Sequence, residues 1–385
     1  MEELSQSHIR AAVSPPNFIA FYLPQFYPTP YNDEWWGKGF TEWTNVVSAR
    51  PKFKDHYQPH LPADLGFYDL RVPEVREAQA DLAQKYGIHG FCYYHYWFNG
   101  KRILERPLDE VVAAGRPELP FCICWANENW SRTWEGRSDT ILLEQHYSQE
   151  DDLAHIHYLL RTLDDRRYIR IEGRPLVLIY RTEMLPDARR TAELWRKEVE
   201  RAGLGGIFLV NIESNYIAFP TSPESLGFDA SVRFEPNFNG FRLKLASHKL
   251  GAVVKDRFGA EIFNALRRLK PRKSEFSDSI YDYAEFIGNW RRAPARPGRH
   301  FECVTPMWDN SARRAKGAHI IKNSTPENYE QWLRDAVARS QPDLHGKRWI
   351  FINAWNEWGE GCHLEPCQRW GRAYLEATDR VFRGL

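Results

Sequence analysis

The sequence predicts a (β/α)8 barrel. Short runs rich in apolar, β-branched and aromatic residues recur eight times along the 385 residues, and longer amphipathic stretches lie between them. Several short runs are almost continuously apolar, which is typical of parallel strands covered on both faces. No glycine follows the first run in Leu23-Pro24-Gln25-Phe26-Tyr27-Pro28, so an open sheet with a dinucleotide-binding turn is the weaker alternative.

The elements follow in order along the chain. The expected strands are Phe18–Leu23, Gly90–Tyr96, Phe121–Trp125, Leu176–Tyr180, Ile207–Ile212, Ala230–Phe234, Cys303–Met307 and Trp349–Ala354. The expected helices are Val72–Tyr86, Leu104–Ala114, Glu150–Leu163, Asp187–Ala202, Tyr281–Arg291, Glu327–Arg339 and about Arg372–Phe382. Long loops follow the first strand (Pro24–Leu70) and the sixth (Asn237–Ser279). Residues 1–16 are expected to form a flexible arm, and residues 17–385 a single catalytic domain.

Composition narrows the classes of partner. With 52 basic and 51 acidic residues the net charge is +1, which argues against nucleic acid as a partner. No apolar stretch approaches about 18 residues, so membrane insertion is not expected. The N-terminus has no apolar signal region, which predicts a cytoplasmic protein, or a periplasmic one if a leader has been removed. The six cysteines lie mostly in apolar runs and are expected to be buried, reduced thiols.

Aromatic and polar residues gather where the expected strands end. Aromatic residues make up 14% of the chain, with 15 Trp and 18 Tyr, which suits either a carbohydrate cleft or a large barrel core. Buried strands end in carboxylates and amides only where these groups face a polar cleft. The expected substrate-binding residues are Tyr22, Gln25, Trp43, His60, Tyr94, His95, Trp97, Trp125, Asn127, Glu128, Glu213, Arg233, Glu235, Trp308, Asp309, Trp355, Asn356 and Trp358.

Glu357 and Glu360 are the expected catalytic pair. Breaking a glycosidic bond requires a proton for the departing oxygen and a second group acting at the anomeric carbon, and two carboxyls in different environments supply both. Residues three apart in a regular strand face opposite sides, so the last strand has to end near Trp355. Gly359 and Gly361 permit a turn that directs both carboxyls inward. The alternative is a loop in which Glu360 only caps backbone N–H groups.

Other chemistries lack their motifs. His60, His95 and His363 do not have zinc spacing, and we expect neither a metal nor a cofactor. The sequence has no G-x-S-x-G elbow and no P-loop. It also lacks the Asp-x-Asp triplet with which many metal-dependent sugar-nucleotide transferases hold a divalent ion, which weakens a transferase interpretation.

Five segments resemble a known family. They are Phe21–Phe26, Glu34–Trp43, Tyr93–Trp97, Cys124–Glu128 and Asn356–Gly361. Together they resemble the WbsX-like proteins, which belong to bacterial polysaccharide loci and are described as glycosyltransferases; this likeness covers about residues 17–375. The last segment is also similar to glycoside hydrolase family 99, the endo-α-mannosidases with (β/α)8 barrels.

The family 99 resemblance implies separate roles for the two glutamates. Glu357 would be the general base that helps the sugar's own 2-hydroxyl attack C1. Glu360 would protonate the leaving group and later activate water, with a 1,2-anhydro sugar between the steps and retention of configuration. Gly359 departs from the bulkier residue that these hydrolases commonly carry, which puts mannose specificity in doubt.

Three functions follow as hypotheses. The first is a retaining hydrolase that cleaves within a bacterial polysaccharide or oligosaccharide, and the carboxyl pair favours it. The second is a glycosyltransferase of O-antigen or capsule assembly, which the family description and the absence of a signal region favour. The third is a carbohydrate-binding barrel without catalysis.

Overall fold

Eight parallel strands form a closed barrel in the computed structural model, which describes residues 14–131, 140–214, 221–239 and 277–384. The strands are β1 (Asn17–Tyr22), β2 (Ile88–Phe98), β4 (Phe121–Trp125), β8 (Arg174–Ile179), β9 (Phe208–Ile212), β10 (Ala230–Arg233), β12 (His300–Val304) and β15 (Trp349–Ile352). Each pairs with the next along the chain, and β15 pairs with β1 to close the ring. The predicted fold and all eight strands are confirmed.

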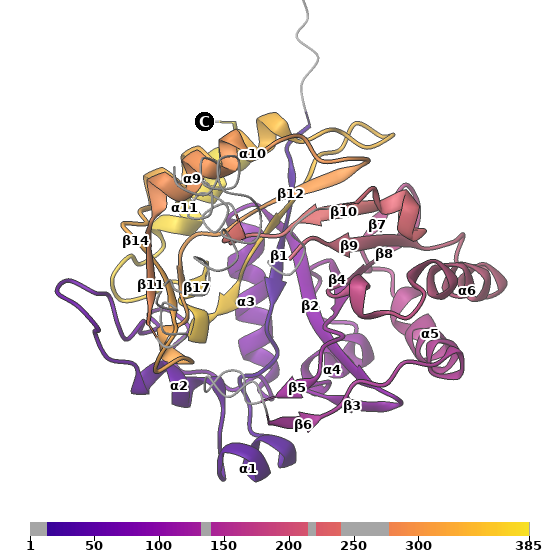
Figure 1. The fold of residues 1–385 in the computed structure, drawn as a ribbon, viewed down its shortest axis with the longest axis horizontal. Helices are drawn as coiled ribbons and strands as arrows, with labels where there is room; N and C mark the ends of the chain where they lie inside the picture. Colours follow the sequence, from indigo (N-terminus) through magenta and orange to yellow (C-terminus); the bar gives the residue numbers. More distant parts are fainter. Residues whose placement is uncertain (1–13, 132–139, 215–220, 240–276, 385) are drawn as a thin grey trace, which may run out of the picture.

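Helices cover the outside of the barrel (Figure 1). They are α3 (Pro73–Lys85), α4 (Arg106–Ala114), α5 (Gln149–Leu163), α6 (Ala188–Arg201), α9 (Tyr283–Arg292), α10 (Pro326–Arg339) and α11 (Ala373–Phe382). All seven predicted helices are present, α5 packing on α6 and α10 on α11. Between β9 and β10 the described residues contain the 3-10 helix η3 (Pro223–Leu226). One bound was wrong: Tyr281 belongs to β11 (Ser279–Asp282), because the Asp282 side chain caps α9 by accepting from the Ala284 nitrogen at 3.0 Å.

The loops after the strands carry smaller elements. The loop after β1 holds two short helices that were not predicted, α1 (Pro30–Trp36) and α2 (Glu42–Ser48). Short strands extend the walls: β3 (Lys101–Ile103) beside β2, β5 (Trp130–Ser131) with β6 (Ile141–Leu143), β7 (Arg170–Ile171) beside β8, and β11 in a sheet with β13 (Trp308–Asp309) and β14 (His319–Lys322). Most of the expected arm at residues 1–16 and of the loop at residues 237–279 lies outside the described residues.

The core is aromatic as well as aliphatic. Phe21 of β1 packs against Tyr94 and Phe351 on the neighbouring strands β2 and β15 and against Phe234 after β10, with ring centroids 5.2–5.6 Å apart. All six cysteines are buried and unpaired by disulfides, as predicted. No helix among the described residues has the length and apolar character needed to cross a bilayer.

Candidate active site

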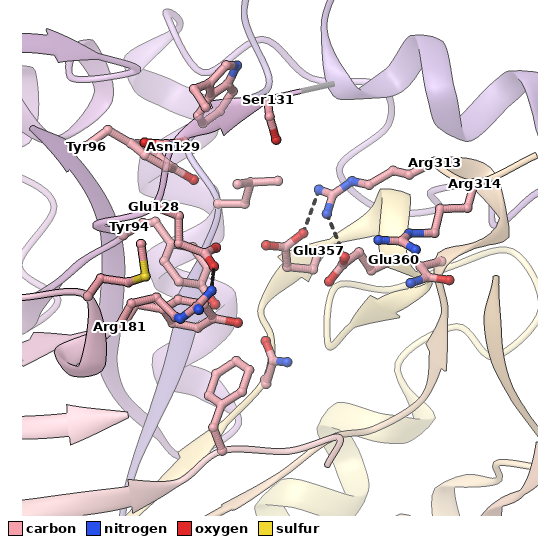
Figure 2. A pocket seen from close by; sticks show the side chains of 18 residues that line it. Tyr94, Tyr96, Glu128, Asn129, Ser131, Arg181, Arg313, Arg314, Glu357 and Glu360 are labelled. Carbon is pink, nitrogen blue, oxygen red and sulfur yellow. Dashed lines mark hydrogen bonds and ion pairs between the residues drawn. The ribbon is translucent and has the colours of Figure 1, made fainter. Parts of the chain in front are cut away.

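The chain after β15 bends back and directs two carboxyl groups into one cavity. Strand β16 (Asn356–Glu357) pairs with β17 (Cys362–His363), and the 3-10 helix η5 (Trp358–Glu360) lies between them. Gly361 ends η5 with a φ of 56°, a left-handed conformation that glycine adopts without strain. Glu357 and Glu360 therefore both line the cavity at the carboxyl ends of the barrel strands (Figure 2), as the sequence predicts.

Asn356 holds this turn against the first strand. Its Oδ1 accepts from the Leu23 nitrogen at 2.7 Å, and its Nδ2 donates to the Leu23 oxygen at 3.0 Å. The side chain thus satisfies both backbone groups of a residue 333 positions away. Two hydrogen bonds of this kind fix the position of the adjacent Glu357.

Arg313 connects the two expected catalytic carboxyls to a third. It follows the 3-10 helix η4 (Asn310–Ala312). Its Nη2 donates to Glu357 Oε2 at 2.8 Å, its Nη1 lies 3.0 Å from Glu360 Oε1, and its Nε donates to Glu42 Oε1 at 2.8 Å. The Arg313 side chain is 4% exposed and that of Glu42 is 0% exposed. Because one cation faces three carboxyls, the cluster favours retaining a proton.

Gly359 has no side chain, and the Glu42 carboxyl occupies the space that a side chain there would fill. A Cβ at this position would lie 1.8 Å from Glu42 Oε1 and 2.8 Å from Arg313 Nε. The φ of Gly359 is outside the left-handed region, so the requirement for glycine here is steric rather than conformational. The departure noted in the sequence thus has a physical reason, since a larger residue would displace Glu42 from the arginine.

Burial raises the pKa of both catalytic candidates. Desolvation raises the pKa of Glu357 to about 8, although Arg313 acts in the opposite direction; the charges of Glu360 and Glu42 add to the rise. Desolvation also raises the pKa of Glu360, and Arg313 again opposes it. With a pKa of about 8, Glu357 holds a proton near neutral pH, so the pair retains a proton that general acid catalysis can use.

The opposite wall of the cavity is aromatic and carries its own ion pair (Figure 2). Tyr94 and Tyr96 reach it from β2, and Glu128 and Arg181 follow β4 and β8. Arg181 pairs with Glu128 and also with Glu183. Asn127 positions Arg181, since its Oδ1 accepts from the Arg181 nitrogen at 2.8 Å and its Nδ2 donates to the Arg181 oxygen at 2.9 Å.

Two asparagines offer further polar groups to the cavity. Asn353, just after β15, donates through Nδ2 to the Glu235 oxygen at 2.9 Å, and its Oδ1 has no partner among the described residues. Asn310, which also lines the cavity, accepts through Oδ1 from the His319 nitrogen at 2.8 Å. Its amide NH₂ has no hydrogen-bond partner within the described part of the chain. Asn353 can therefore accept a hydrogen bond from a hydroxyl group, and Asn310 can donate one to a hydroxyl or anionic group.

A buried carboxyl supports the catalytic turn from behind. Glu365 accepts from Trp358 Nε1 at 2.6 Å, from Gln79 Nε2 at 2.6 Å and from the Tyr68 hydroxyl at 2.8 Å. Burial raises the pKa of Glu365 to about 7 despite these hydrogen bonds. The Trp358 ring stacks on His363 with centroids 3.7 Å apart. Trp358 was expected to bind substrate, and it serves here to anchor the segment that carries Glu357.

The structure separates the predicted binding residues into three groups. Tyr94 and Glu128 line the cavity that contains Glu357 and Glu360. His60, Trp308 and Asp309 line a second cavity, where Asp309 accepts from His56 Nε2 at 2.6 Å. The others are buried and line neither cavity: Tyr22, Gln25, Trp43, His95, Trp97, Trp125, Asn127, Glu213, Arg233, Glu235, Trp355, Asn356 and Trp358.

Several of these buried residues have partners that explain their position. His95 Nε2 lies 3.0 Å from His155 Nε2, and Trp97 donates to Asp151 Oδ1 at 2.9 Å. Glu213 accepts from the Ser231 hydroxyl at 2.7 Å. Burial raises the pKa of Glu235 to about 7. These contacts are with other parts of the protein, behind the cavity wall. Direct contact between these residues and a substrate stays a prediction.

The predicted set of binding residues omits several residues that line the cavity. They are Tyr96, Asn129, Trp130, Ser131, Tyr180, Arg181, Phe234, Asn310, Arg313, Arg314 and Asn353, together with Glu42 behind them. Glu42 belongs to the conspicuous segment Glu34–Trp43, which was a usable signal. Arg313 lies 44 residues before Glu357 within an ordinary basic stretch, and nothing local in the sequence distinguishes it.

Comparison with known proteins places the chain in a family. The sequence model described as "Glycosyltransferase WbsX" matches residues 18–378. The chain belongs to the WbsX family. Two relatives of this chain are the WxcX proteins of Xanthomonas campestris pv. campestris strains B100 and ATCC 33913, each 42% identical over 367 residues. The match covers 94% of this chain and 49% of each relative, so the chain spans about half the length of these proteins.

Solved structures share the fold of this WbsX protein. A family 99 endo-α-mannosidase from Bacteroides thetaiotaomicron, in complex with BIS-TRIS-propane, aligns over 96% of this chain and 97% of its own with a TM-score of 0.53 at 14% identity. A glycoside hydrolase-like protein aligns over 96% of this chain and 94% of its own with a TM-score of 0.55 at 13% identity. The predicted membership of the WbsX family is confirmed, and at these identities the likeness to the family 99 structure concerns the fold alone.

Proposed function

We propose that this WbsX protein is a retaining glycoside hydrolase that acts within bacterial polysaccharides or oligosaccharides. The observation that carries the proposal is the carboxyl pair of one short turn: Glu357 and Glu360 line one cavity and contact one buried arginine. Hydrolysis of a glycosidic bond needs two carboxyl groups beside the bound sugar, and this cavity provides both. The barrel shared with family 99 supports the same chemistry.

The proposed mechanism divides the work between the two carboxyls. Glu357 removes the proton of the sugar's 2-hydroxyl while that oxygen attacks C1. Glu360 gives its proton to the departing oxygen, so the glycosidic bond breaks and a 1,2-anhydro sugar forms. Glu360 then takes a proton from water as the water attacks C1 from the original face, and Glu357 returns its proton to O2 as the C1–O2 bond breaks. Arg313 remains bound to one oxygen of each carboxyl and leaves the second oxygen of each for the reaction.

The total number of protons on the two carboxyls fits this division of roles. The first step needs one proton on the pair, and burial keeps a proton there at neutral pH. When a sugar fills the cavity, its 2-hydroxyl and glycosidic oxygen decide which carboxyl holds that proton. The route also requires a 2-hydroxyl trans to the leaving group, which favours α-mannose-like and α-rhamnose-like sugars.

Isosteric variants test the proposal. Glu357→Gln and Glu360→Gln should each lower kcat on 4-nitrophenyl α-mannosides or α-rhamnosides, or on oligosaccharides ending in them, by about 10²- to 10⁴-fold with little change in binding. Glu183→Gln is the matched control, because Glu183 pairs with Arg181 and does not line the cavity. Near wild-type turnover in both of the first two variants would contradict the assignment.

A glycosyltransferase is the second candidate, because the matched family carries that description. It predicts binding of a sugar nucleotide. Isothermal titration against a panel of sugar nucleotides tests this directly, and absence of binding to all of them would exclude the transferase.

A further inference from the structure

One arginine on the cavity wall is left over when the charges of the site are paired. Arg313 serves Glu42, Glu357 and Glu360, and Arg181 serves Glu128 and Glu183. Arg314, the next residue along the chain from Arg313, also lines the cavity and is partly exposed. Its guanidinium has no hydrogen bond or ion pair with any residue that the structure describes.

Arg314 stands beside a second unused donor. Asn310 is 8% exposed and lines the same cavity. The two residues belong to one turn, in which the Arg314 nitrogen donates to the Asn310 oxygen at 3.0 Å. Because the Asn310 Oδ1 is occupied by the His319 nitrogen, the group that the Asn310 side chain can offer is its NH₂. Figure 2 shows Arg314 next to Glu360, and Arg314 and the Asn310 NH₂ both offer donors to the cavity.

We propose that Arg314 and Asn310 form a subsite for an anionic oxygen group, a carboxylate or a phosphate, carried on the leaving-group side of the saccharide. Guanidinium and amide N–H groups recognise such oxygens through charge-assisted hydrogen bonds. The leaving-group side follows from the neighbour: Glu360 is the residue that protonates the departing oxygen. In this respect the inference rests on the proposed function.

Two sources supply this chemistry, and they correspond to different reactions. A uronic acid residue in a polysaccharide carries a carboxylate, which suits hydrolysis. A nucleotide leaving group carries a diphosphate, which suits transfer. The donor set accepts either anion, so the experiment needs one arm for each.

The test is calorimetric titration of the full chain with methyl glucuronoside, methyl glucoside and inorganic pyrophosphate. Arg314→Gln should weaken the binding of whichever anion binds by about tenfold or more, and Arg314→Lys should weaken it less because the charge remains. Lys316→Gln is the control: it removes the same charge two residues away, at a position that does not line the cavity, and should change nothing. Binding of glucuronoside but not glucoside points to an acidic glycan, and binding of pyrophosphate alone points to a diphosphate.

Three results would overturn the subsite. They are no binding of either anion, equal weakening by Lys316→Gln and Arg314→Gln, or unchanged anion affinity in Arg314→Gln together with a shifted pH profile of activity. The last result would mean that Arg314 acts only on Glu360, whose pKa it helps Arg313 to lower against the effect of burial. Anion binding requires no turnover, so failure of this inference is distinct from failure of the catalytic assignment, which the Glu357→Gln and Glu360→Gln variants test.

Discussion

Replacing Gly359 with alanine should break the charged cluster without touching a charged residue. The new Cβ would meet Glu42 Oε1 at 1.8 Å and Arg313 Nε at 2.8 Å, distances that no side chain adopts without displacing its neighbour. Glu42 is completely buried, and besides Arg313 its side chain has one hydrogen-bond partner among the described residues, Asn45, whose Nδ2 donates to Oε1 at 3.4 Å. Moving its carboxyl leaves a buried charge without its partner, a change that typically costs about 3–5 kcal/mol.

A double-mutant cycle measures this cost. Unfolding in urea is followed by tryptophan fluorescence and circular dichroism, whose transitions should coincide. Gly359→Ala alone should lower the free energy of unfolding by about 3 kcal/mol or more. In a Glu42→Ala background it should cost far less, because the clashing carboxyl is gone, giving a coupling energy of about 1–3 kcal/mol.

Gly288→Ala in α9 is the control for the glycine itself. A Cβ there would meet its nearest atom, Arg292 Nη1, at 3.4 Å, an ordinary contact. It should change stability by no more than about 1 kcal/mol, in the stabilising direction. If Gly359→Ala is as harmless as Gly288→Ala, or equally harmful with and without Glu42, the steric reasoning is wrong.

Three further predictions concern pH. The first step needs one proton on the pair, and Glu357 gives up its proton as pH passes its pKa of about 8, so kcat/KM should fall above that pH. Glu42→Gln removes a charge that raises this pKa and should move the alkaline limb to lower pH. Burial raises the pKa of Glu365 to about 7, so its contribution to folding is fully present below its unfolded pKa of about 4.5 and is lost as pH rises through 7. In urea titrations between pH 5 and pH 9, the free energy of unfolding of Glu365→Gln should therefore rise by up to about 3 kcal/mol relative to wild type. A constant difference between the two proteins would contradict this. His95 has the opposite pH dependence, because burial lowers its pKa to about 3 and its contribution to folding is present above about pH 6.5 and lost at lower pH. In the same assay, the free energy of unfolding of His95→Gln should rise by about 2–3 kcal/mol relative to wild type as pH falls from 7.5 to 4.5.

The sequence revealed the barrel because each strand is buried on both faces. Ile123 and Val177, for example, sit in runs where the sheet neighbours and the outer helices both require apolar side chains, so position along the chain was enough to locate β4 and β8. The helices α1 and α2 were missed because they have only seven residues each, although Thr29 before Pro30 is a readable cap: its side chain accepts from the Asn32 nitrogen.

The site was predictable only where it is local. Glu357 and Glu360 belong to one turn, whose glycines signal the bend. Arg313 reaches that turn from the loop after β12, and no pattern in its own neighbourhood indicates a pairing 44 residues away. Trp358 was assigned to the substrate because tryptophan suits sugars, yet whether a rim tryptophan faces the cavity or the packing behind it depends on the course of the turn, which composition does not fix.

The central claim is that Glu357 and Glu360 act on opposite sides of one glycosidic bond. A crystal structure of Glu360→Gln with a bound oligosaccharide tests it most directly. We predict the sugar 2-hydroxyl within hydrogen-bond distance of Glu357 and the glycosidic oxygen within hydrogen-bond distance of residue 360, with Arg313 still bound to both side chains. A saccharide bound in the cavity with neither side chain near its anomeric carbon, or bound only elsewhere on the barrel, would contradict it.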